Sequence, residues 1–559
     1  MTEPISPVDG LSDRFWESIL ELNPTTATFY GDERYADRLE DPSPEGRAKV
    51  RALMERTAAE AAAIPTDGLS TEERITRDML QVIGELAVEE DDQGLYQLRV
   101  VDQMSGPQQM LPQLTQFQPV DTPEHLEAFI GRLRAYPAFM AANTVILREA
   151  LGTGLTAPSI VTERTIAQLE RMIAIPIDAA IIPGNLQGAS DEDRERIRDV
   201  VRESVYPADA AFLDVLRGEY RHASREEPGI WSAPNGEQIY RTAIRSWTTL
   251  ELDPHDIHEI GLIELEAIDA ERREIARAAG FGDDVAAYRR SLDEDPANTP
   301  RTKDELVGRA REDIERAMAA APGYFGRLPS AGCQVRAVEE YKERDAPPAY
   351  YYPPSDTGTR DGVYYANGYD LPSRRYTKLA TTTYHEAAPG HHFQISLEME
   401  HPSLNRFRRL GARMVGGAYV EGWGLYSERL ADEMGLYRSD GERFGMLDGQ
   451  AWRAARLVVD TGIHALRWER QQSIDLLIER AGLSDTDAAI ETDRYICWPA
   501  QALTYKLGQR QIEALRREIS ERDGSGFDLL AFHDQVLGHG SLPLATLARE
   551  LPNWVTPAD

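Results

Sequence analysis

Apolar residues recur at intervals of three and four along most of the chain, with Glu and Arg between them. This spacing places the apolar residues on one face of an amphipathic helix. Several of these segments open with a helix-start signal, as in Ser43-Pro44 and Ser70-Thr71-Glu72-Glu73. The pattern therefore predicts a mainly α-helical protein, with helices that include 13–22, 44–64, 71–89, 123–151, 190–220, 256–279 and 303–321.

The helical pattern stops near Tyr341 and resumes at about Thr377. The intervening sequence is aromatic and rich in turn residues, and Pro353 and Pro354 would break any helix there. Residues 362–367 read as a short strand. We therefore expect a small β element before a second helical run, which continues to about residue 517 and ends in a short pair of helices near residue 551.

The best candidate for a domain boundary is the stretch 224–236, which contains two prolines and two glycines. It predicts a helical N-terminal half, 1–235, that covers the cleft, and a catalytic half, 236–559. The same stretch also fits a long surface loop, so we expect the two halves to form one continuous architectural unit.

Composition and charge narrow the choice of partners. The 559 residues carry a formal net charge of −33, which repels phosphate backbones and anionic lipid, so we expect no nucleic acid or membrane partner. The two cysteines, Cys333 and Cys497, suit a reducing compartment, and the first residues lack the features of a signal peptide. These observations predict a soluble cytoplasmic protein, whose oligomeric state stays open.

The candidate chemistry lies in one motif, His385-Glu386-Ala387-Ala388-Pro389-Gly390-His391. In the usual His-Glu-x-x-His motif, two histidines on one helical face bind zinc and the glutamate is the general base. Here Pro389 stands where the second histidine would be. In a regular helix His391 would lie about 9 Å along the axis from His385, too far to share one ion.

Pro389 and Gly390 predict that the helix is broken. Proline lacks an N–H and would clash with the carbonyl of His385, whereas glycine tolerates unusual backbone angles. A Pro-Gly bulge would return His391 to the place of the missing ligand. Two alternatives stay open at this point: His392 could be the ligand, or both histidines could merely cap a broken helix.

The sequence resembles the bacterial family known as domain of unknown function 885, which is regarded as similar to the gluzincin zinc metallopeptidases. The resemblance covers nearly the whole chain and rests on several motifs. They are His385-Glu386-x-x-Pro389-Gly390-His391-His392-x-Gln394, Leu22-Asn23-Pro24-Thr25-x-Ala27-Thr28, Gly362-Val363-Tyr364-Tyr365, Glu421-Gly422-Trp423-Gly424-Leu425-Tyr426, the run from Arg456 to His464, Arg494-Tyr495, and Pro499-x-Gln501-Ala502 with Tyr505.

The resemblance implies the remaining ligands of one zinc ion per chain. Gluzincins take their third ligand from a glutamate on a following helix, and Glu421 fits that position, although it could also be a helix cap. Glu428 would lie on much the same helical face and could accept a hydrogen bond from a ligand histidine. A solvated helix face explains Glu428 equally well.

Other residues are candidates for contact with the substrate or with developing charge. Arg456, Asp460 and His464 share one helical face, so Asp460 could orient His464 as an oxyanion donor; a buried structural pair is the alternative. Tyr505 resembles the tyrosine donor of gluzincins, and Tyr495 is nearly as good a candidate. Arg494 completes this polar and aromatic cluster.

The strand before the motif suggests how a peptide could bind. In zincins an edge strand at this place pairs with the substrate backbone, which implies contacts along Tyr364, Tyr365 and Ala366. An ordinary hairpin strand is the alternative. Together these features predict a zinc-dependent peptidase of short peptides. A hydrolase of non-peptide amides and a metal-binding or peptide-binding protein without turnover are the other hypotheses.

Overall fold

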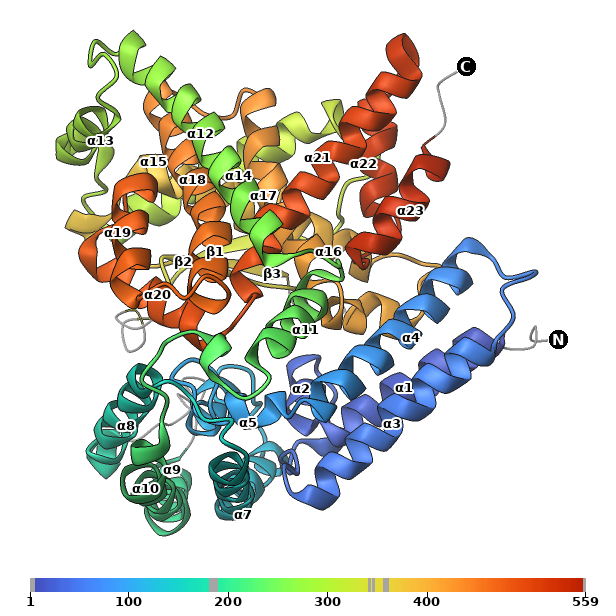
Figure 1. Cartoon of the computed structure of the whole chain (residues 1–559), viewed down its shortest axis with the longest axis vertical. Helices are drawn as coiled ribbons and strands as arrows, with labels where there is room; N and C mark the ends of the chain where they lie inside the picture. The colour runs from blue at the N-terminus through green and yellow to red at the C-terminus, as the bar shows by residue number, and fades with distance from the viewer. Residues whose placement is uncertain (1–5, 180–189, 340–342, 344–346, 355–360, 556–559) are drawn as a thin grey trace. The chain divides into compact units, whose positions relative to one another are not determined.

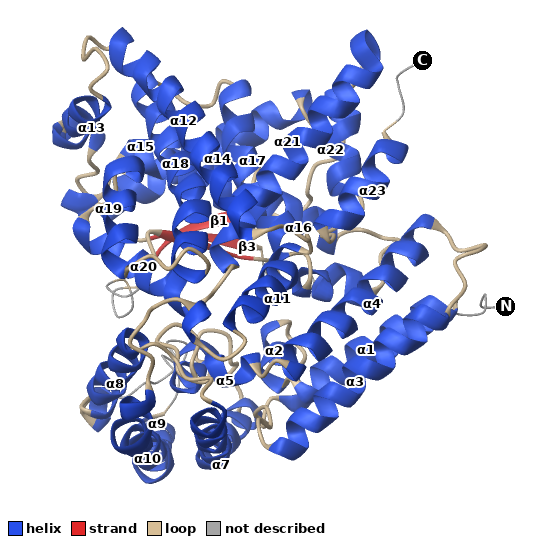
Figure 2. Cartoon of the chain, in the orientation of Figure 1, coloured by secondary structure: helices blue, strands red, loops and turns tan. Residues whose placement is uncertain are grey.

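The computed structural model describes residues 6–179, 190–339, 343, 347–354 and 361–555. Within these residues the protein is mainly α-helical with one small sheet, as the sequence predicts (Figures 1 and 2). The helices of the first part of the chain are α1 (Pro7–Leu22), α2 (Pro24–Phe29), α3 (Pro44–Ala63), α4 (Thr71–Asp92), α5 (Leu95–Arg99), α6 (Met110–Leu114), α7 (Pro123–Thr153), α8 (Ser159–Ile173), α9 (Asp191–Val200), α10 (Tyr206–Val215) and α11 (Gly236–Thr248).

The later elements contain the sheet and the candidate motif. They are α12 (Pro254–Ala278), α13 (Val285–Glu294), α14 (Lys303–Ala320), β1 (Cys333–Ala337), β2 (Ala349–Tyr352), β3 (Gly362–Ala366), α15 (Tyr376–Glu386), α16 (His391–Met399), α17 (Gly417–Glu433), α18 (Asp440–His464), α19 (Arg470–Ala481), α20 (Asp485–Cys497), α21 (Thr504–Asp523), α22 (Leu529–Leu537) and α23 (Leu544–Trp554).

The chain forms two compact units. The first contains Met1–Ala243, Ile463–Arg470 and Ile490–Pro499, and the second contains Ile244–Gly462, Gln471–Ala489 and Ala500–Asp559. The sequence predicts a boundary after residue 235, with all later residues in one half. It gave no sign that two short segments from the end of the chain belong with the first unit.

Two of the predicted helices differ from the observed ones in where they begin or how they are divided. Helix α1 begins at Pro7 rather than at residue 13, because the Ser6 hydroxyl caps it by accepting the N–H of Asp9 at 3.1 Å. The single helix predicted for 190–220 is divided, since π-helical turns at Val201–Val205 and Leu216–Tyr220 flank α10.

In the first unit, α7 carries a buried cation that organises the N-terminal segment. The guanidinium of Arg132 donates to the carbonyl oxygens of Arg38 at 2.7 Å, Pro24 at 2.9 Å and Tyr35 at 3.2 Å. It also donates to the hydroxyl of Thr28 at 2.8 Å. The motif from Leu22 to Thr28 therefore supplies acceptors for one buried arginine, which is a structural role.

In the second unit, the sheet has the order β1-β3-β2, with β1 parallel and β2 antiparallel to β3. It packs against α14 and α15, the helix that leads into the motif (Figure 2). Helix α17 packs against α15 and most extensively against α21. Among the described residues, no helix combines the length and the apolar character needed to cross a bilayer.

Candidate metal centre

The motif helix is broken, as Pro389 and Gly390 predict. Helix α15 ends at Glu386 and α16 begins at His391, with a cis peptide bond between Ala388 and Pro389. Gly390 turns the chain at a point of close approach, because a Cβ on it would lie 1.9 Å from the carbonyl oxygen of His385. Only glycine fits there without moving the backbone.

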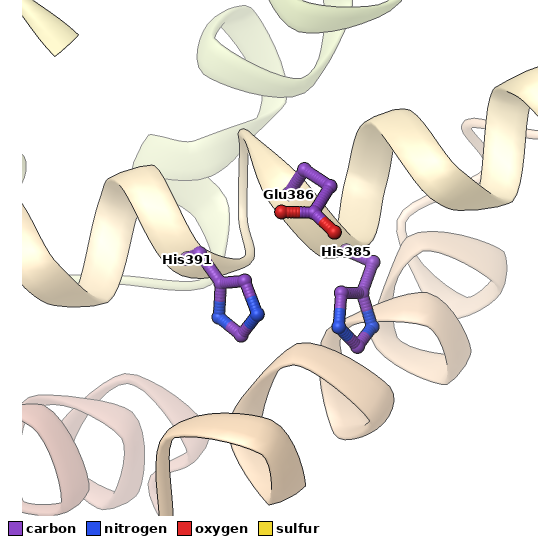
Figure 3. A group of neighbouring side chains, drawn as sticks. All are labelled: His385, Glu386 and His391. Carbon is purple, nitrogen blue, oxygen red and sulfur yellow. The ribbon is translucent and has the colours of Figure 1, made fainter. Parts of the chain in front are cut away.

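The break brings the two histidines of the motif together. Figure 3 shows the imidazoles of His385 and His391 side by side, one from each side of the break, with the carboxylate of Glu386 nearby. The ring centroids are 4.6 Å apart and the ring planes are at 78°. One nitrogen or oxygen atom from each of these three side chains lies within 4.8 Å of the others.

Glu421 on α17 completes this cluster. Its Oε2 atom lies 3.5 Å from Nε2 of His385 and 3.6 Å from Nε2 of His391. Ligand atoms at about 2.1 Å from one tetrahedral zinc ion are separated by about 3.4 Å. The Oε2 atom of Glu421 is therefore spaced from each of the two Nε2 atoms as neighbouring ligands of one ion are, and this equal approach to both imidazoles makes Glu421, rather than Glu386, the candidate third ligand.

The two carboxylates of the cluster differ in their electrostatics. Burial would raise the pKa of Glu421, but its contacts with His385 and His391 outweigh burial and hold that pKa well below its usual range. Burial raises the pKa of Glu386, against the opposing attraction of His391 and His385. Glu421 is thus stabilised as an anion, whereas Glu386 is the carboxylate that more readily accepts a proton.

Glu428, also on α17, binds the nitrogen of His385 that faces away from the cluster. The Nδ1–H of His385 donates to Oε1 of Glu428 at 2.9 Å, and Glu428 is fully buried. Burial would lower the pKa of His385, but Glu421 and Glu428 raise it to about 9. Because Nδ1 carries this bond, Nε2 is the nitrogen that faces Glu421.

The motif Glu421-Gly422-Trp423-Gly424 explains why α17 can serve the site. A Cβ on Gly424 would lie 2.8–2.9 Å from ring atoms of both His385 and His391, so the imidazoles rest on the bare helix backbone. The Trp423 Nε1–H donates to the carbonyl oxygen of Pro389 at 2.9 Å and so fixes the break. Gly422 contacts Gly508 of α21, where a Cβ on either residue would clash with the other helix.

The contact between α17 and α21 brings Tyr505 to the site. The ring of Tyr505 stacks on His385 with centroids 6.3 Å apart and planes at 24°. The guanidinium of Arg456 lies over the Tyr505 ring, 4.4 Å from its centroid. The carboxylate of Asp460 accepts the N–H of Ala500 at 3.1 and 3.2 Å. Two side chains of α18 therefore hold Tyr505 and the segment that leads into α21.

His464 does not fit the role of oxyanion donor. Its Nδ1 accepts the N–H of Ile230 at 3.1 Å, and its Nε2–H donates to the carbonyl oxygen of Tyr495 at 2.9 Å. Burial lowers the pKa of His464 to about 3, so the ring is neutral. With both ring nitrogens bonded to backbone groups of the first unit, neither is available to Asp460 or to a substrate, and the structural alternative holds.

Tyr495 and Arg494 also belong to the first unit. The hydroxyl of Tyr495 donates to Oε2 of Glu491 at 2.7 Å, and Arg494 donates to the same oxygen at 2.8 Å. Within the second unit, it is Tyr505 that lies against His385. The choice between the two tyrosines, which sequence reasoning left open, therefore favours Tyr505.

The edge-strand role predicted for Tyr364, Tyr365 and Ala366 is wrong. Strand β3 is the central strand: Tyr364 pairs with Val335 of β1 on one side and with Tyr351 of β2 on the other. Both backbone edges are used, so no peptide can pair with β3. The side chain of Tyr364 is fully buried, and its hydroxyl accepts a hydrogen bond from Thr383 at 3.3 Å.

His392, the alternative ligand, points away from the cluster. Its Nε2–H donates to the carbonyl oxygen of Ala331 at 3.2 Å, and its Nδ1 accepts the hydroxyl of Tyr351 at 2.9 Å. Burial lowers the pKa of His392 to about 4. This histidine ties the motif to β2 and to the segment before β1, so His391 is the candidate ligand.

Sequence reasoning missed a set of polar residues behind Glu428. Gln450 of α18 donates to Oε2 of Glu428 at 3.2 Å, and Arg453 lies 3.7 Å from Oε1. Lys506 of α21 donates to Gln450. The available signal was a lysine and a glutamine at positions where the helical pattern requires burial, since such residues need partners in the interior.

In this mainly helical protein, two histidines and two glutamates thus converge where the motif helix breaks. The chain belongs to the family described as "Bacterial protein of unknown function (DUF885)", which matches residues 24–551. No curated protein matches the chain.

Two solved structures are similar over almost the whole chain. A protein described as "the putative lipoprotein from Colwellia psychrerythraea" is 28% identical, with a TM-score of 0.90 and 98% of each chain covered. "A putative lipoprotein of unknown function from Shewanella oneidensis" is 19% identical, with a TM-score of 0.75 and coverage of 98% of this chain and 99% of that chain. The second likeness concerns the fold alone.

Proposed function

We propose that this protein is a zinc-dependent hydrolase that cleaves short peptides, with one zinc ion per chain held by His385, His391 and Glu421. The observation that carries the proposal is the position of the Glu421 carboxylate, 3.5 and 3.6 Å from the two imidazole Nε2 atoms. Two imidazoles and one carboxylate are a common ligand set of catalytic zinc, which leaves a position open.

Each side chain of the cluster has a role in this proposal. When bound, zinc acts as a Lewis acid that polarises a carbonyl group and makes a water molecule more acidic. Glu386 lies beside the ligands and accepts the proton of the attacking water, then passes it to the leaving nitrogen. Tyr505, stacked on His385, offers its hydroxyl to the negative charge that develops on the carbonyl oxygen.

The ligand set can be tested by metal content. We expect about one zinc per chain by elemental analysis, lost in His385→Ala and in Glu421→Gln. Glu433→Gln is a matched control, because Glu433 is on the same helix as Glu421 but forms an ion pair with Arg516. Failure of the parent protein to take up zinc would remove the proposal.

The catalytic role can be tested separately from metal binding. Glu386→Gln should retain zinc but lose hydrolysis of a peptide library read by mass spectrometry, with the parent protein as reference. Equal cleavage by both proteins would show that Glu386 is not the base. Cleavage of simple amides but of no peptide would instead favour a hydrolase of non-peptide amides, and zinc uptake without any turnover would favour a binding protein.

We keep the cytoplasmic location as a prediction from the cysteine content of the chain. The lipoprotein descriptions of the two solved relatives concern those proteins, and they make a membrane-attached form the natural alternative. Cell fractionation followed by detection of the intact chain distinguishes the two locations.

A further inference from the structure

A lysine is buried in the second unit, close to the candidate metal centre. Lys506 follows Tyr505 on α21 and is only 2% exposed. Its ammonium group donates to Oε1 of Gln450 at 2.9 Å and to Oε1 of Gln509 at 2.6 Å. The nearest carboxylate is that of Glu264, at 3.9 Å. A buried charge is costly unless it is paired and hydrogen-bonded, so the partners of this ammonium group are held in place with it.

The ammonium group determines how the amide of Gln450 is turned. An ammonium can only donate hydrogen bonds, so the amide oxygen of Gln450 must face Lys506. The amide nitrogen then faces the other way, where it donates to Oε2 of Glu428 at 3.2 Å and to the carbonyl oxygen of Leu425 at 3.1 Å. Turned over, the amide would present its oxygen to the Glu428 carboxylate and repel it.

Two further hydrogen bonds connect Gln450 through Glu428 to the proposed ligand His385. With Oε2 of Glu428 satisfied by Gln450, Oε1 accepts the Nδ1–H of His385 at 2.9 Å. That bond places the proton of the imidazole on Nδ1 and leaves Nε2 as the nitrogen that faces Glu421. The series Lys506–Gln450–Glu428–His385 thus connects helices α21, α18, α17 and α15.

Several charged groups surround Lys506. Glu264 on α12, Glu513 on α21, and Arg429 and Glu428 on α17 act on its ammonium group. Burial lowers the pKa of Lys506 to about 8, although Glu264, Glu513 and Glu428 oppose this shift. The lysine is therefore cationic at neutral pH, and its positive charge also favours the ionised form of Glu428.

We propose that Lys506 is a positioning residue of the metal centre, which orients Gln450 and through it the Glu428–His385 pair. This inference rests on the proposed function but assigns a role to Lys506 and Gln450, which are not among the proposed ligands. It predicts that loss of the ammonium group weakens metal binding, although Lys506 lies three side chains away from the ligand atom.

The test measures the affinity of the purified full chain for Zn²⁺ alone, by competition with a chelator. Loss of an outer partner of a metal ligand weakens binding about 10- to 100-fold. We expect Lys506→Met to lose about tenfold in affinity, and Gln450→Leu to lose at least as much. Lys506→Gln, which can still donate one hydrogen bond to Gln450, should recover part of the loss. Lys303→Met, which removes a lysine paired with Glu343, is the control that should match the parent.

A double variant tests whether Lys506 acts through Gln450. If it does, Lys506→Met/Gln450→Leu binds Zn²⁺ as weakly as Gln450→Leu alone, because the second change has nothing left to disturb. Losses that multiply would overturn the proposal. The absorption spectrum of the Co²⁺-loaded chain gives a second reading, since a turned His385 changes the ligand field.

The outcomes separate this inference from the proposed function. A parent protein that binds no Zn²⁺ would refute the proposed function itself. A parent that binds Zn²⁺, together with a Lys506→Met variant of equal affinity and equal Co²⁺ spectrum, would refute only the positioning role. Thermal unfolding of the metal-free variants followed by circular dichroism identifies any that fail to fold, and Lys506→Gln, which changes the interior least, then decides the result.

Discussion

Gly424 allows a prediction in which metal affinity and stability respond differently to one methyl group. In Gly424→Ala the added Cβ would lie 2.8 Å from Cε1 and 2.9 Å from Nε2 of His385, and 2.9 Å from Cε1 of His391. Ordinary van der Waals contact begins at 3.4 Å, so each ring must retreat by roughly 0.5 Å. Metal–ligand distances tolerate only about 0.2 Å of change.

The expected magnitudes follow from that displacement. We expect Gly424→Ala to lose at least about tenfold in affinity for Zn²⁺, equivalent to about 1.4 kcal/mol. The metal-free protein should change little in its free energy of unfolding. Its histidines can turn away from the methyl group, and alanine gains about 1 kcal/mol over glycine inside a helix.

The assay pairs chelator competition with urea unfolding of the metal-free chain. The matched control is Gly308→Ala in α14, where nothing lies within 4 Å of the added Cβ. It should gain up to about 1 kcal/mol in stability and bind Zn²⁺ like the parent. Equal zinc affinity of Gly424→Ala and the parent would show that the imidazoles do not rest on α17 and would refute this geometry of the site.

Three other changes give further tests. Glu428→Gln should weaken Zn²⁺ binding about 10- to 100-fold, measured by the same competition, because His385 loses its ionised acceptor. Burial raises the pKa of Asp209 to about 7, so the protein should lose up to about 4 kcal/mol of unfolding free energy as pH rises from about 4 to 7. Asp209→Asn keeps an acceptor for the Tyr136 hydroxyl. In this variant, the free energy of unfolding measured in urea should no longer fall over this pH range. Arg132→Met should destabilise the protein by about 3 kcal/mol or more in thermal or urea unfolding, since several buried carbonyl oxygens lose their donor. An unchanged melting profile would contradict the structural role of that arginine.

Features that depend on neighbouring residues could be predicted from the sequence. Periodic apolar positions were sufficient for the mainly helical class, and Pro389 with Gly390 was sufficient for a broken helix. Proline cannot continue the hydrogen bonds of a helix, and this holds in any surroundings. The convergence of His385 and His391 followed from that local break.

Features that depend on distant segments could not be predicted in this way. Spacing by four put Asp460 and His464 on one helical face, but tertiary packing gave His464 two backbone partners instead. Strand character identified β3, but only the pairing of β1 and β2 with it showed that it is central.

Local patterns in the chain were thus sufficient to predict which segments are helical, where the motif helix breaks and which residue types are available for chemistry. Packing between distant helices set which imidazole nitrogen faces Glu421, which tyrosine lies against His385 and which buried lysine donates to Gln450 next to Glu428. The physical reason is the distance along the chain over which each kind of interaction acts. Steric limits of the backbone act within a few residues, whereas hydrogen-bond partners in the interior are set by the way helices from distant parts of the chain pack together.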